Sequence, residues 1–418
     1  MKRRKIFICL LVISISFVGH ARERDRRAIT YDTLIQEIVD RVSIDSCRVA
    51  LEELTGIYSR YMGNAQWNNG VVVPLIKQKF LDYGCDSIYE IPVPGYNAPV
   101  VTGIKKGKKD PSVRKFCFIG AHPDNILSSG NSMGRIYGAN DNASGMVAVL
   151  EACRVTKNIS FENTICFSAL NAEEMEIKGS AELATYFNEH NLKIIGGAIT
   201  YEMLANAPNL DSGIAYYYST QIPQSQVMAT TIAELADLYN LYTVKLVGVA
   251  SVPGDVLRFW EKGYSAVCGY GHMDENYGPM EHTLADSIGP WTNYEHFVRC
   301  AKTGLAALVH YAVPMEQTSI KKEVNACIQR GEIGISFRPE QIVFTIQNDN
   351  KPISVKIYSI NGKVVTSFYG GNNSLGGSTV FIWDKKDNRG NPIAYGMYIV
   401  HCFMKGNVAF RKISVIDR

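Results

Sequence analysis

The sequence has no Cys-x-x-Cys pair, no internal repeat and, after its first residues, no apolar run long enough to span a membrane. The missing thiolate pair argues against a zinc knuckle or a thioredoxin-type redox site. A formal net charge of +3 over 418 residues gives no reason to expect a nucleic acid or acidic polymer as partner. The apolar and charged contents are ordinary, which excludes a disordered or collagen-like chain. The length favours two domains.

The start of the chain predicts export. A basic stretch, 2–5, precedes the apolar run 6–18, and small residues Gly19 and Ala21 follow. This is the layout of a secretory signal, because an apolar core of about 13 residues is too short to anchor the chain in a bilayer. We expect residues 1–21 to be a signal peptide, so that the mature chain begins near Arg22. N-terminal sequencing of the exported protein would check this.

Cysteine usage adds little to this picture. Removal of the signal takes Cys9 with it and leaves nine of the ten cysteines, an odd number. At least one thiol is therefore free if the others pair. Cys117 and Cys166 lie inside apolar runs and are expected in the core.

Short apolar runs alternate with helical stretches between the signal and about residue 314. Residues 31–83 show helical spacing of apolar residues. Beyond them, strands are predicted at 116–121, 164–170, 194–200 and 265–270, and helices at 143–156, 180–190 and 225–239. Such alternation predicts an α/β fold with a mixed, largely parallel sheet flanked by helices. We assign this catalytic domain to residues 25–314.

The character of the sequence changes after this domain. Residues 315–336 are mostly polar and are interpreted as a linker. Residues 337–418 contain short alternating strands, with a hairpin signal at Asn361-Gly362 and another turn at 405–407. We predict a small all-β sandwich of about 80 residues there.

Imidazoles and carboxylates collect where the predicted strands end. His122 and Asp124 follow the first strand, Glu173 and Glu174 follow the second, and Glu202 follows the third. A loop after the fourth strand reaches His282, and Asp141 lies in a loop that enters a helix. In open α/β sheets, ligands bind beyond the carboxyl ends of the strands. These side chains therefore predict a cation site, and mixed nitrogen and oxygen ligation fits zinc.

The chemistry of such a site gives the two neighbouring glutamates different tasks. Two metals with a bridging carboxylate can hold a hydroxide and polarise a carbonyl together. A carboxylate that does not bind metal must then take the proton from the water. Adjacent glutamates suit this division, since one can bind metal while its neighbour faces the substrate.

Four segments, "GAHPDN", "GANDNASG", "NAEEMEIKGS" and "EHTLAD", resemble those of the bacterial di-zinc aminopeptidases of metallopeptidase family twenty-eight. The resemblance extends over roughly residues 30–312 and includes "GDVLRFWEKGYSAV". It implies a zinc-exopeptidase fold, two zinc ions per chain and peptide substrates that lose their N-terminal residue. Carried over by position, it implies metal ligation by His122, Asp141 as the bridge, Glu174, Glu202 and His282. It also implies Glu173 as general base and Asp124 as the carboxylate that orients His122.

Two positions differ from the family pattern. Glu202 stands where the family usually has aspartate, and Asn140 stands where many relatives carry an acid. Glutamate also offers an oxygen ligand, so we expect Glu202 to bind the second zinc ion, at the weaker of the two sites.

Several alternatives remain open from the sequence. A related cyclase would convert N-terminal glutamine to pyroglutamate with one zinc ion, although Asp141 within "DNASG" favours the peptidase. An inactive binding protein would have little reason to keep Glu173, and another metallo-exopeptidase is a further alternative. Ser132 lies in a G-x-S-x-G pattern, but the strand and helix that a nucleophile elbow needs are not predicted around it. His272 competes with His282 but lacks the Thr283 and Asp286 context.

The C-terminal segments "VKIYSINGKVV", "FIWDKKDNRGNPIAYGMYIV" and "FRKISVI" resemble the sorting domains that the type IX secretion machinery reads. This implies an export-machinery partner and a secreted or cell-surface protein of a Gram-negative bacterium, with no permanent membrane anchor. The alternative is an immunoglobulin-like sandwich that binds surfaces or carbohydrate.

Overall fold

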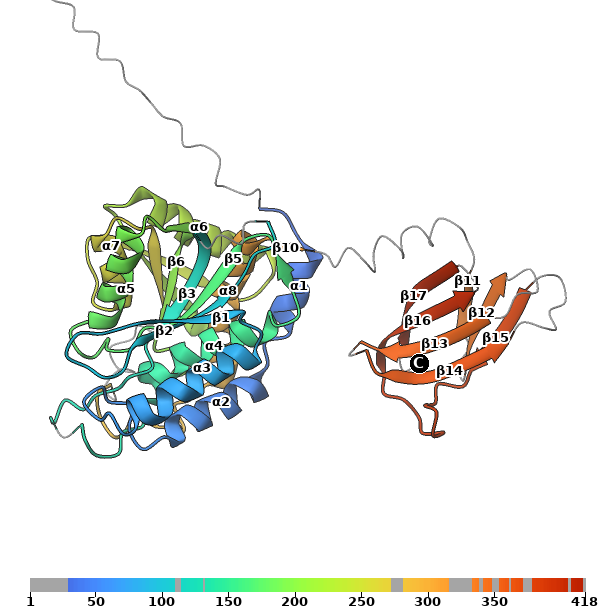
Figure 1. Ribbon diagram of the computed structural model, residues 1–418, viewed down its shortest axis with the longest axis horizontal. Coiled ribbons are helices and arrows are strands. Elements are labelled where there is room, and N and C mark those ends of the chain that lie inside the picture. Colours follow the sequence, from blue (N-terminus) through green and yellow to red (C-terminus); the bar gives the residue numbers. More distant parts are fainter. Residues whose placement is uncertain are drawn as a thin grey trace, which may run out of the picture. The chain divides into compact units, whose positions relative to one another are not determined.

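The chain forms two compact units, Met1–Pro314 and Met315–Arg418, in the computed structural model (Figure 1). The structure describes residues 29–109, 114–130, 132–271, 281–315, 333–337, 341–347, 353–360, 362–370, 378–404 and 407–415. The predicted signal peptide, 1–21, lies outside these residues, as does most of the predicted linker, 315–336. In the described part of the chain, no helix has the length and apolar character needed to cross a membrane.

The first unit is built on an eight-stranded sheet with the order β1-β2-β5-β3-β6-β9-β7-β8. The strands are β1 Ser87–Ile91, β2 Val100–Lys105, β3 Lys115–Ala121, β5 Thr164–Ala169, β6 Lys193–Glu202, β7 Ile214–Ser219, β8 Val244–Val249 and β9 Ala266–Tyr270. The central strands β5, β3, β6 and β9 run parallel, while β2 and β7 join them antiparallel. This sheet confirms the predicted mixed, largely parallel α/β fold. A two-stranded sheet, β4 (Ser160–Phe161) with β10 (Pro314–Met315), lies apart from it.

Helices cover both faces of the large sheet (Figure 1). They are α1 Thr33–Asp40, α2 Ile44–Gly56, α3 Val73–Asp82, α4 Gly145–Val155, α5 Lys178–Glu189, α6 Pro223–Leu238, α7 Asp255–Glu261 and α8 Tyr294–Ala312, with short turns η1 Asn68–Val72, η2 Ala139–Ser144 and η3 Leu210–Ser212. α4 and α8 pack on β3 and β6, whereas α5 and α7 pack on each other.

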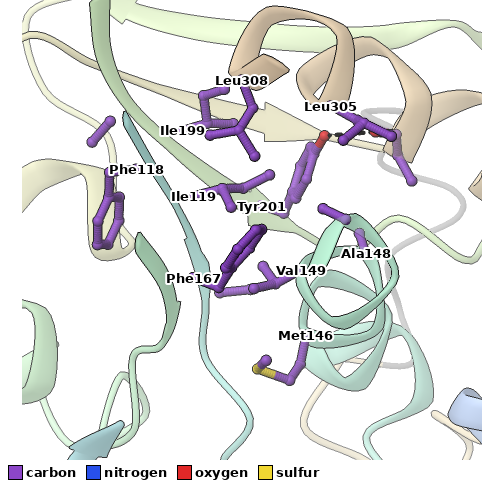
Figure 2. Packing of buried hydrophobic residues seen from close by; sticks show 14 of the residues in the cluster. Phe118, Ile119, Met146, Ala148, Val149, Phe167, Ile199, Tyr201, Leu305 and Leu308 are labelled. Carbon is purple, nitrogen blue, oxygen red and sulfur yellow. Dashed lines mark hydrogen bonds between the residues drawn. The ribbon is translucent and has the colours of Figure 1, made fainter. Parts of the chain in front are cut away.

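The alternation of side chains along β3 shows how both faces are buried. Phe118 packs edge-on against Phe187 of α5 and contacts Phe259 of α7. Its neighbour Ile119 points to the other face, toward α4 and α8, where Tyr201 of β6 also lies (Figure 2). Both positions of β3 are fully buried. A strand with apolar residues on both faces is typical of the centre of a helix-covered parallel sheet.

The observed elements differ from the predicted ones in several places, and helices α7 and α8 are among those that were not predicted. The helix predicted at 143–156 begins earlier as the π-type turn η2 and becomes α-helical only at Gly145. Strands β1, β2, β7 and β8 were not predicted. β1 and β8 are partly exposed edge strands, whose mixed burial leaves no continuous apolar run.

The direction of β7 decides where the chain runs after β6. Because β7 is antiparallel to β9 and β9 is parallel to β6, β7 starts at the edge of the sheet where β6 ends. Residues 203–213 therefore stay at the carboxyl edge of the central strands. An isolated bridge between Asn206 and Thr292 fastens this segment to the region before α8.

The second unit consists of two antiparallel sheets, β11-β12-β15 and β14-β13-β16-β17. The strands are β11 Ile333–Phe337, β12 Ile342–Gln347, β13 Ile353–Ser359, β14 Val364–Gly370, β15 Ser378–Trp383, β16 Gly396–Met404 and β17 Asn407–Val415. One apolar cluster joins them, with Phe344 and Trp383 from the first sheet and Val355 and Val400 from the second. These sheets are the all-β part predicted for the C-terminal region.

The start of the second unit differs from the predicted boundary. β11 begins at Ile333, inside the segment 315–336 that was interpreted as a linker. Polar and charged residues are interspersed with the apolar ones through that segment and conceal the alternation of its last residues, which pair with β12. The predicted hairpin is present, since β13 pairs with β14 and the Gly362 amide donates to Ser359, while Asn361 lies outside the described residues.

Candidate metal centre

Three neighbouring strands bring their following residues to one edge of the sheet. His122 follows β3, Glu173 and Glu174 follow β5, and Glu202 is the last residue of β6. β5, β3 and β6 are adjacent and parallel, so their carboxyl ends meet at that edge. The predicted convergence of these side chains is therefore observed. The result is a cluster of carboxylates next to the imidazole of His122.

Asp141 stands between the two imidazoles of the site. Its Oδ1 lies 3.5 Å from Nε2 of His122, and its Oδ2 lies 3.1 Å from Nε2 of His282. The residue belongs to η2, where its backbone leaves helical geometry, and it is buried. His282 comes from the loop after β9 and has a positive φ of 54°. One carboxylate thus offers a separate oxygen to each histidine.

Two further carboxylates complete the two halves of the site. Oε2 of Glu202 lies 3.2 Å from Nε2 of His122, and Oε2 of Glu174 lies 3.0 Å from Nε2 of His282. One half of the site therefore consists of His122, Glu202 and one oxygen of Asp141, and the other half consists of His282, Glu174 and the second oxygen of Asp141. All five residues predicted as metal ligands lie in this one cluster.

The donor atoms fit divalent metal ions. Oε1 of Glu174 and Oε1 of Glu202 are buried and have no hydrogen-bond donor among the described residues. A buried carboxylate oxygen without a donor is costly unless a cation compensates it. His122, Asp141 and Glu174 each offer a ligand atom within 4.8 Å of the others. Two imidazoles and three carboxylates form the mixed set typical of zinc.

Glu173 lies beside this cluster, but its carboxylate is farther from the imidazole of His122 than the carboxylate of Glu202 is. Its Oε2 is 4.0 Å from Nε2 of His122. Burial, together with the nearby carboxylates of Glu202 and Asp255, raises the pKa of Glu173 to about 9, although the His122 charge opposes the shift. Its carboxyl group therefore has a high affinity for a proton in the metal-free protein.

Asp124 connects the two strand ends. Nδ1 of His122 lies 3.2 Å from its backbone oxygen and 3.6 Å from its Oδ1. The same carboxylate also accepts from the backbone amides of Glu173 at 3.3 Å and Glu174 at 3.2 Å. Asp124 thus fixes the glutamate loop as well as the imidazole, a second contact that the sequence did not indicate.

Burial and the interactions within the cluster raise the pKa values of Glu174, His282 and His122. Burial raises the pKa of Glu174 to about 7, with the Asp141 charge as the next cause. Hydrogen bonds to Asp141 and Glu174 raise the pKa of His282 to about 11. Burial alone would lower the pKa of His122, but Glu202, Asp124 and Glu173 raise it well above its usual range. The metal-free cluster therefore retains protons that a dication would displace.

The metal-free protein should become less stable as pH rises from about 5 to about 9. Glu174 and Glu173 have folded-state pKa values of about 7 and about 9, above the usual 4.5. The folded chain therefore holds more protons than the unfolded chain in this range, and the free energy of unfolding falls as pH increases. Thermal unfolding with chelator at pH 5.5 and 8.5 would measure this. Zinc should raise Tm more at pH 8.5, and a chelated Tm that rose with pH would contradict the assignment.

Other residues at the site were not predicted. Oε1 of Glu281 lies 3.8 Å from Nε2 of His282, and with Asp141 these residues form a second possible ligand group. Asn140 accepts the backbone amides of Ala205 and Asn206, so the amide found in place of an acid holds a loop. Arg60 is also buried, in a segment where no functional residue was predicted.

The serine and histidine alternatives do not form sites in the described structure. Ser132 is buried in a loop, where its hydroxyl accepts from the Leu127 amide, with no strand immediately before it and no helix after it. The nucleophile elbow is therefore absent from that position. His272 lies outside the described residues.

Comparison with known proteins places this site in a family. Residues 100–308, half of the chain, match the model of peptidase family M28. Aminopeptidase YwaD of Bacillus subtilis is 29% identical over 236 residues, which are 54% of this chain and 48% of the relative. A probable zinc metalloprotease of Pyricularia oryzae is 25% identical over 183 residues, 40% of this chain and 36% of the relative. The chain thus spans about half the length of the first of these relatives and about a third of the length of the second.

Solved structures share the fold at lower identity. The LapA aminopeptidase of Legionella pneumophila has a TM-score of 0.58 and 21% identity, over 75% of this chain and 81% of that one. A glutaminyl cyclase of Bacteroides thetaiotaomicron has a TM-score of 0.51 and 16% identity, over 64% and 97% respectively. Both likenesses concern the fold, and the cyclase shows that this fold also supports another reaction.

Proposed function

Because the chain belongs to peptidase family M28, we propose that it is a zinc-dependent aminopeptidase that removes the N-terminal residue of peptides. The single observation that carries this proposal is the arrangement around Asp141. One carboxylate serves two imidazoles, each with its own further carboxylate, and Glu173 lies beside them. This is the arrangement that two-metal hydrolysis requires.

We assign the metal-binding roles from the same distances. His122 and Glu202 would hold one zinc ion, His282 and Glu174 the other, and Asp141 would contribute one oxygen to each. Zinc bound here would acidify water and polarise the scissile carbonyl. The half that contains Glu202 differs from the usual family pattern, and we expect it to bind its ion less tightly.

Glu173 is assigned the proton transfer. It is close to the metal ligands but lies farther from the imidazole than Glu202 does, 4.0 Å against 3.2 Å. As a carboxylate it would accept a proton from the attacking water and donate it to the leaving amine. Asp124 keeps this side chain in place through the amides of the glutamate loop. Carboxylates of the site whose negative charge is not fully balanced by bound metal would hold the free α-amine of the substrate.

Purified protein should hydrolyse a panel of aminoacyl-p-nitroanilides, lose this activity with chelator and regain it with zinc. An N-acetylated substrate is the matched control, since it lacks the free α-amine and should not be cleaved. A glutaminyl substrate that releases pyroglutamate instead of free glutamine would show a cyclase. No turnover of any substrate by zinc-loaded protein would support the inactive-binder alternative.

We further propose that the chain is exported, with the signal at 1–21 and the C-terminal region as a sorting domain read by type IX machinery. The support is the sequence pattern of both ends together with the separate all-β unit that begins near β11. If the sorting interpretation is right, deletion of residues 337–418 should leave the protein in the periplasm, because the signal at 1–21 still takes it across the inner membrane.

A further inference from the structure

Arg60 is a fully buried arginine whose guanidinium group donates only to backbone carbonyls in the described structure. Its Nε donates to Pro123 at 2.7 Å and its Nη2 to Gly138 at 2.7 Å. Its Nη1 donates to Tyr137 at 2.6 Å and to Leu54 at 3.1 Å. Side-chain exposure is zero, so solvent does not compete for these bonds. Four charge-assisted bonds from one rigid fork fix the relative position of three chain segments.

Three of the four carbonyls that Arg60 holds belong to the two loops that carry Asp141 and His122, and the fourth belongs to Leu54 of α2. Pro123 directly follows His122 at the end of β3. Gly138 lies three residues before Asp141, at the start of η2. Arg60 itself comes from the segment after α2, far from both in sequence. The guanidinium group therefore ties one metal ligand to the bridging carboxylate without touching either side chain.

Asp286 holds the other end of the same loop. Its Oδ1 accepts from the Asn140 amide at 2.7 Å, and its Oδ2 accepts from the Asp141 amide at 2.9 Å. Asp286 lies four residues after His282, so it also connects the second imidazole loop to Asp141. A cation thus binds the carbonyls of 137–138 and an anion binds the amides of 140–141. Both charges agree with the direction of the peptide dipoles.

The local backbone leaves room for this arrangement only because residue 138 is glycine. Gly138 has a φ of 52°, in the left-handed region. A Cβ there would lie 2.8 Å from Nη2 of Arg60 and 2.5 Å from the backbone oxygen of Asp141. Any other residue would force the guanidinium group or the Asp141 loop to move.

The charge of Arg60 suits a cluster that lacks its metal ions. Burial lowers the pKa of Arg60 to about 10, and the Asp286, Asp124, Asp141 and Glu174 charges oppose the shift. The guanidinium group therefore stays charged at neutral pH, close to the carboxylates of the site. The positive charge reduces their mutual repulsion before a dication binds.

We propose that Arg60 and Asp286 are positioning residues that hold the loop 137–141, so that Asp141 already lies between His122 and His282 when metal arrives. This inference rests on the proposed function and deepens it. Only the zinc-affinity measurement described below depends on the proposed function being right, whereas the amide-exchange measurement does not. A site prepared in this way does not have to order its bridging ligand on binding, which favours metal affinity.

Arg60→Lys tests the proposal, with Arg154→Lys as the matched control. Arg154 donates to Glu151 and to the Arg41 carbonyl, close to the N-terminal helices and away from the site. Lysine keeps the charge at position 60 but cannot span the carbonyls. In chelated protein, the Asn140 and Asp141 amides of Arg60→Lys should exchange with deuterium at least about tenfold faster than in wild type. Affinity for both zinc ions, measured by competition with a chromophoric chelator, should fall about 10- to 100-fold. Arg154→Lys should change neither quantity.

Asp286→Asn provides the second variant in case Arg60→Lys does not fold. Its amide nitrogen would face a backbone amide, so the same exchange and affinity changes are expected. Wild-type amide exchange in both variants, or in whichever one folds, would overturn the proposal. If the wild-type protein bound no zinc, the proposed function would fail while the exchange comparison would still decide the positioning role.

Discussion

Glu173→Gln should lower kcat by about 10²- to 10⁴-fold while the protein folds and keeps its zinc. Glutamine keeps the shape of the side chain and its ability to hydrogen-bond, but it cannot accept a proton at neutral pH. The geometry assigns this effect to proton transfer, because Glu173 lies 4.0 Å from Nε2 of His122 and outside both ligand sets. Steady-state kinetics on an aminoacyl-p-nitroanilide, with zinc content measured on the same sample, would check the prediction.

The matched control is Glu176→Gln, in the same loop but with a side chain that is 87% exposed. It should retain wild-type kcat. The neighbouring variant Glu174→Gln should instead lose zinc affinity, because a neutral amide is a poor ligand for a dication. If Glu173→Gln lost its zinc and Glu174→Gln kept it, the two roles would be exchanged. Full activity in zinc-loaded Glu173→Gln would disprove the proposed mechanism.

Asp141→Asn should lose both zinc ions together. Each half of the site takes one oxygen of Asp141, so the substitution removes a charged ligand from both at once. The loss of affinity should exceed the 10- to 100-fold that removal of an outer hydrogen-bond partner costs, about two orders of magnitude or more. Peptidase activity should fall with it. Metal analysis after dialysis and chelator competition would measure the two ions separately.

Glu202→Gln is the control for Asp141→Asn, because it should affect one zinc ion and not both. Of the two imidazoles of the site, Glu202 approaches only that of His122, so this variant should release one ion and keep the other. Stepwise loss in Glu202→Gln and joint loss in Asp141→Asn would together identify the bridge. Two ions bound at wild-type affinity in Asp141→Asn would mean that Asp141 is not shared.

The convergence of the candidate ligands could be predicted because their positions follow from the sheet. Apolar runs mark the central strands, and the residue after each run must lie at the carboxyl edge if the strands are parallel. His122, Glu174 and Glu202 illustrate this, since β3, β5 and β6 are neighbours in space. Strand alternation also predicted the C-terminal sheets, where Val355 and Val400 face one cluster.

The supports of the site could not be predicted in the same way. Arg60 binds backbone carbonyls, and because every residue has one, the residue types in a sequence do not indicate which carbonyls an arginine will bind. Asp124 was expected to orient an imidazole, but its bonds to the amides of the glutamate loop depend on how that loop turns. The loop turns sharply, with positive φ values at Ala172, Glu176 and Ile177, none of which is glycine. Contacts of this kind arise only after the chain has folded.

The reversal of direction at β7 separates the residues on which the candidate metal centre depends from an exposed segment that can change. Residues 203–213 turn at the edge of the site, where Asn140 and the bridge to Thr292 anchor the first part of the segment. The tip, 208–211, is exposed. Insertions at this tip would leave the strand register and every metal ligand unchanged. The length and sequence of this tip can therefore change without disturbing the candidate metal centre.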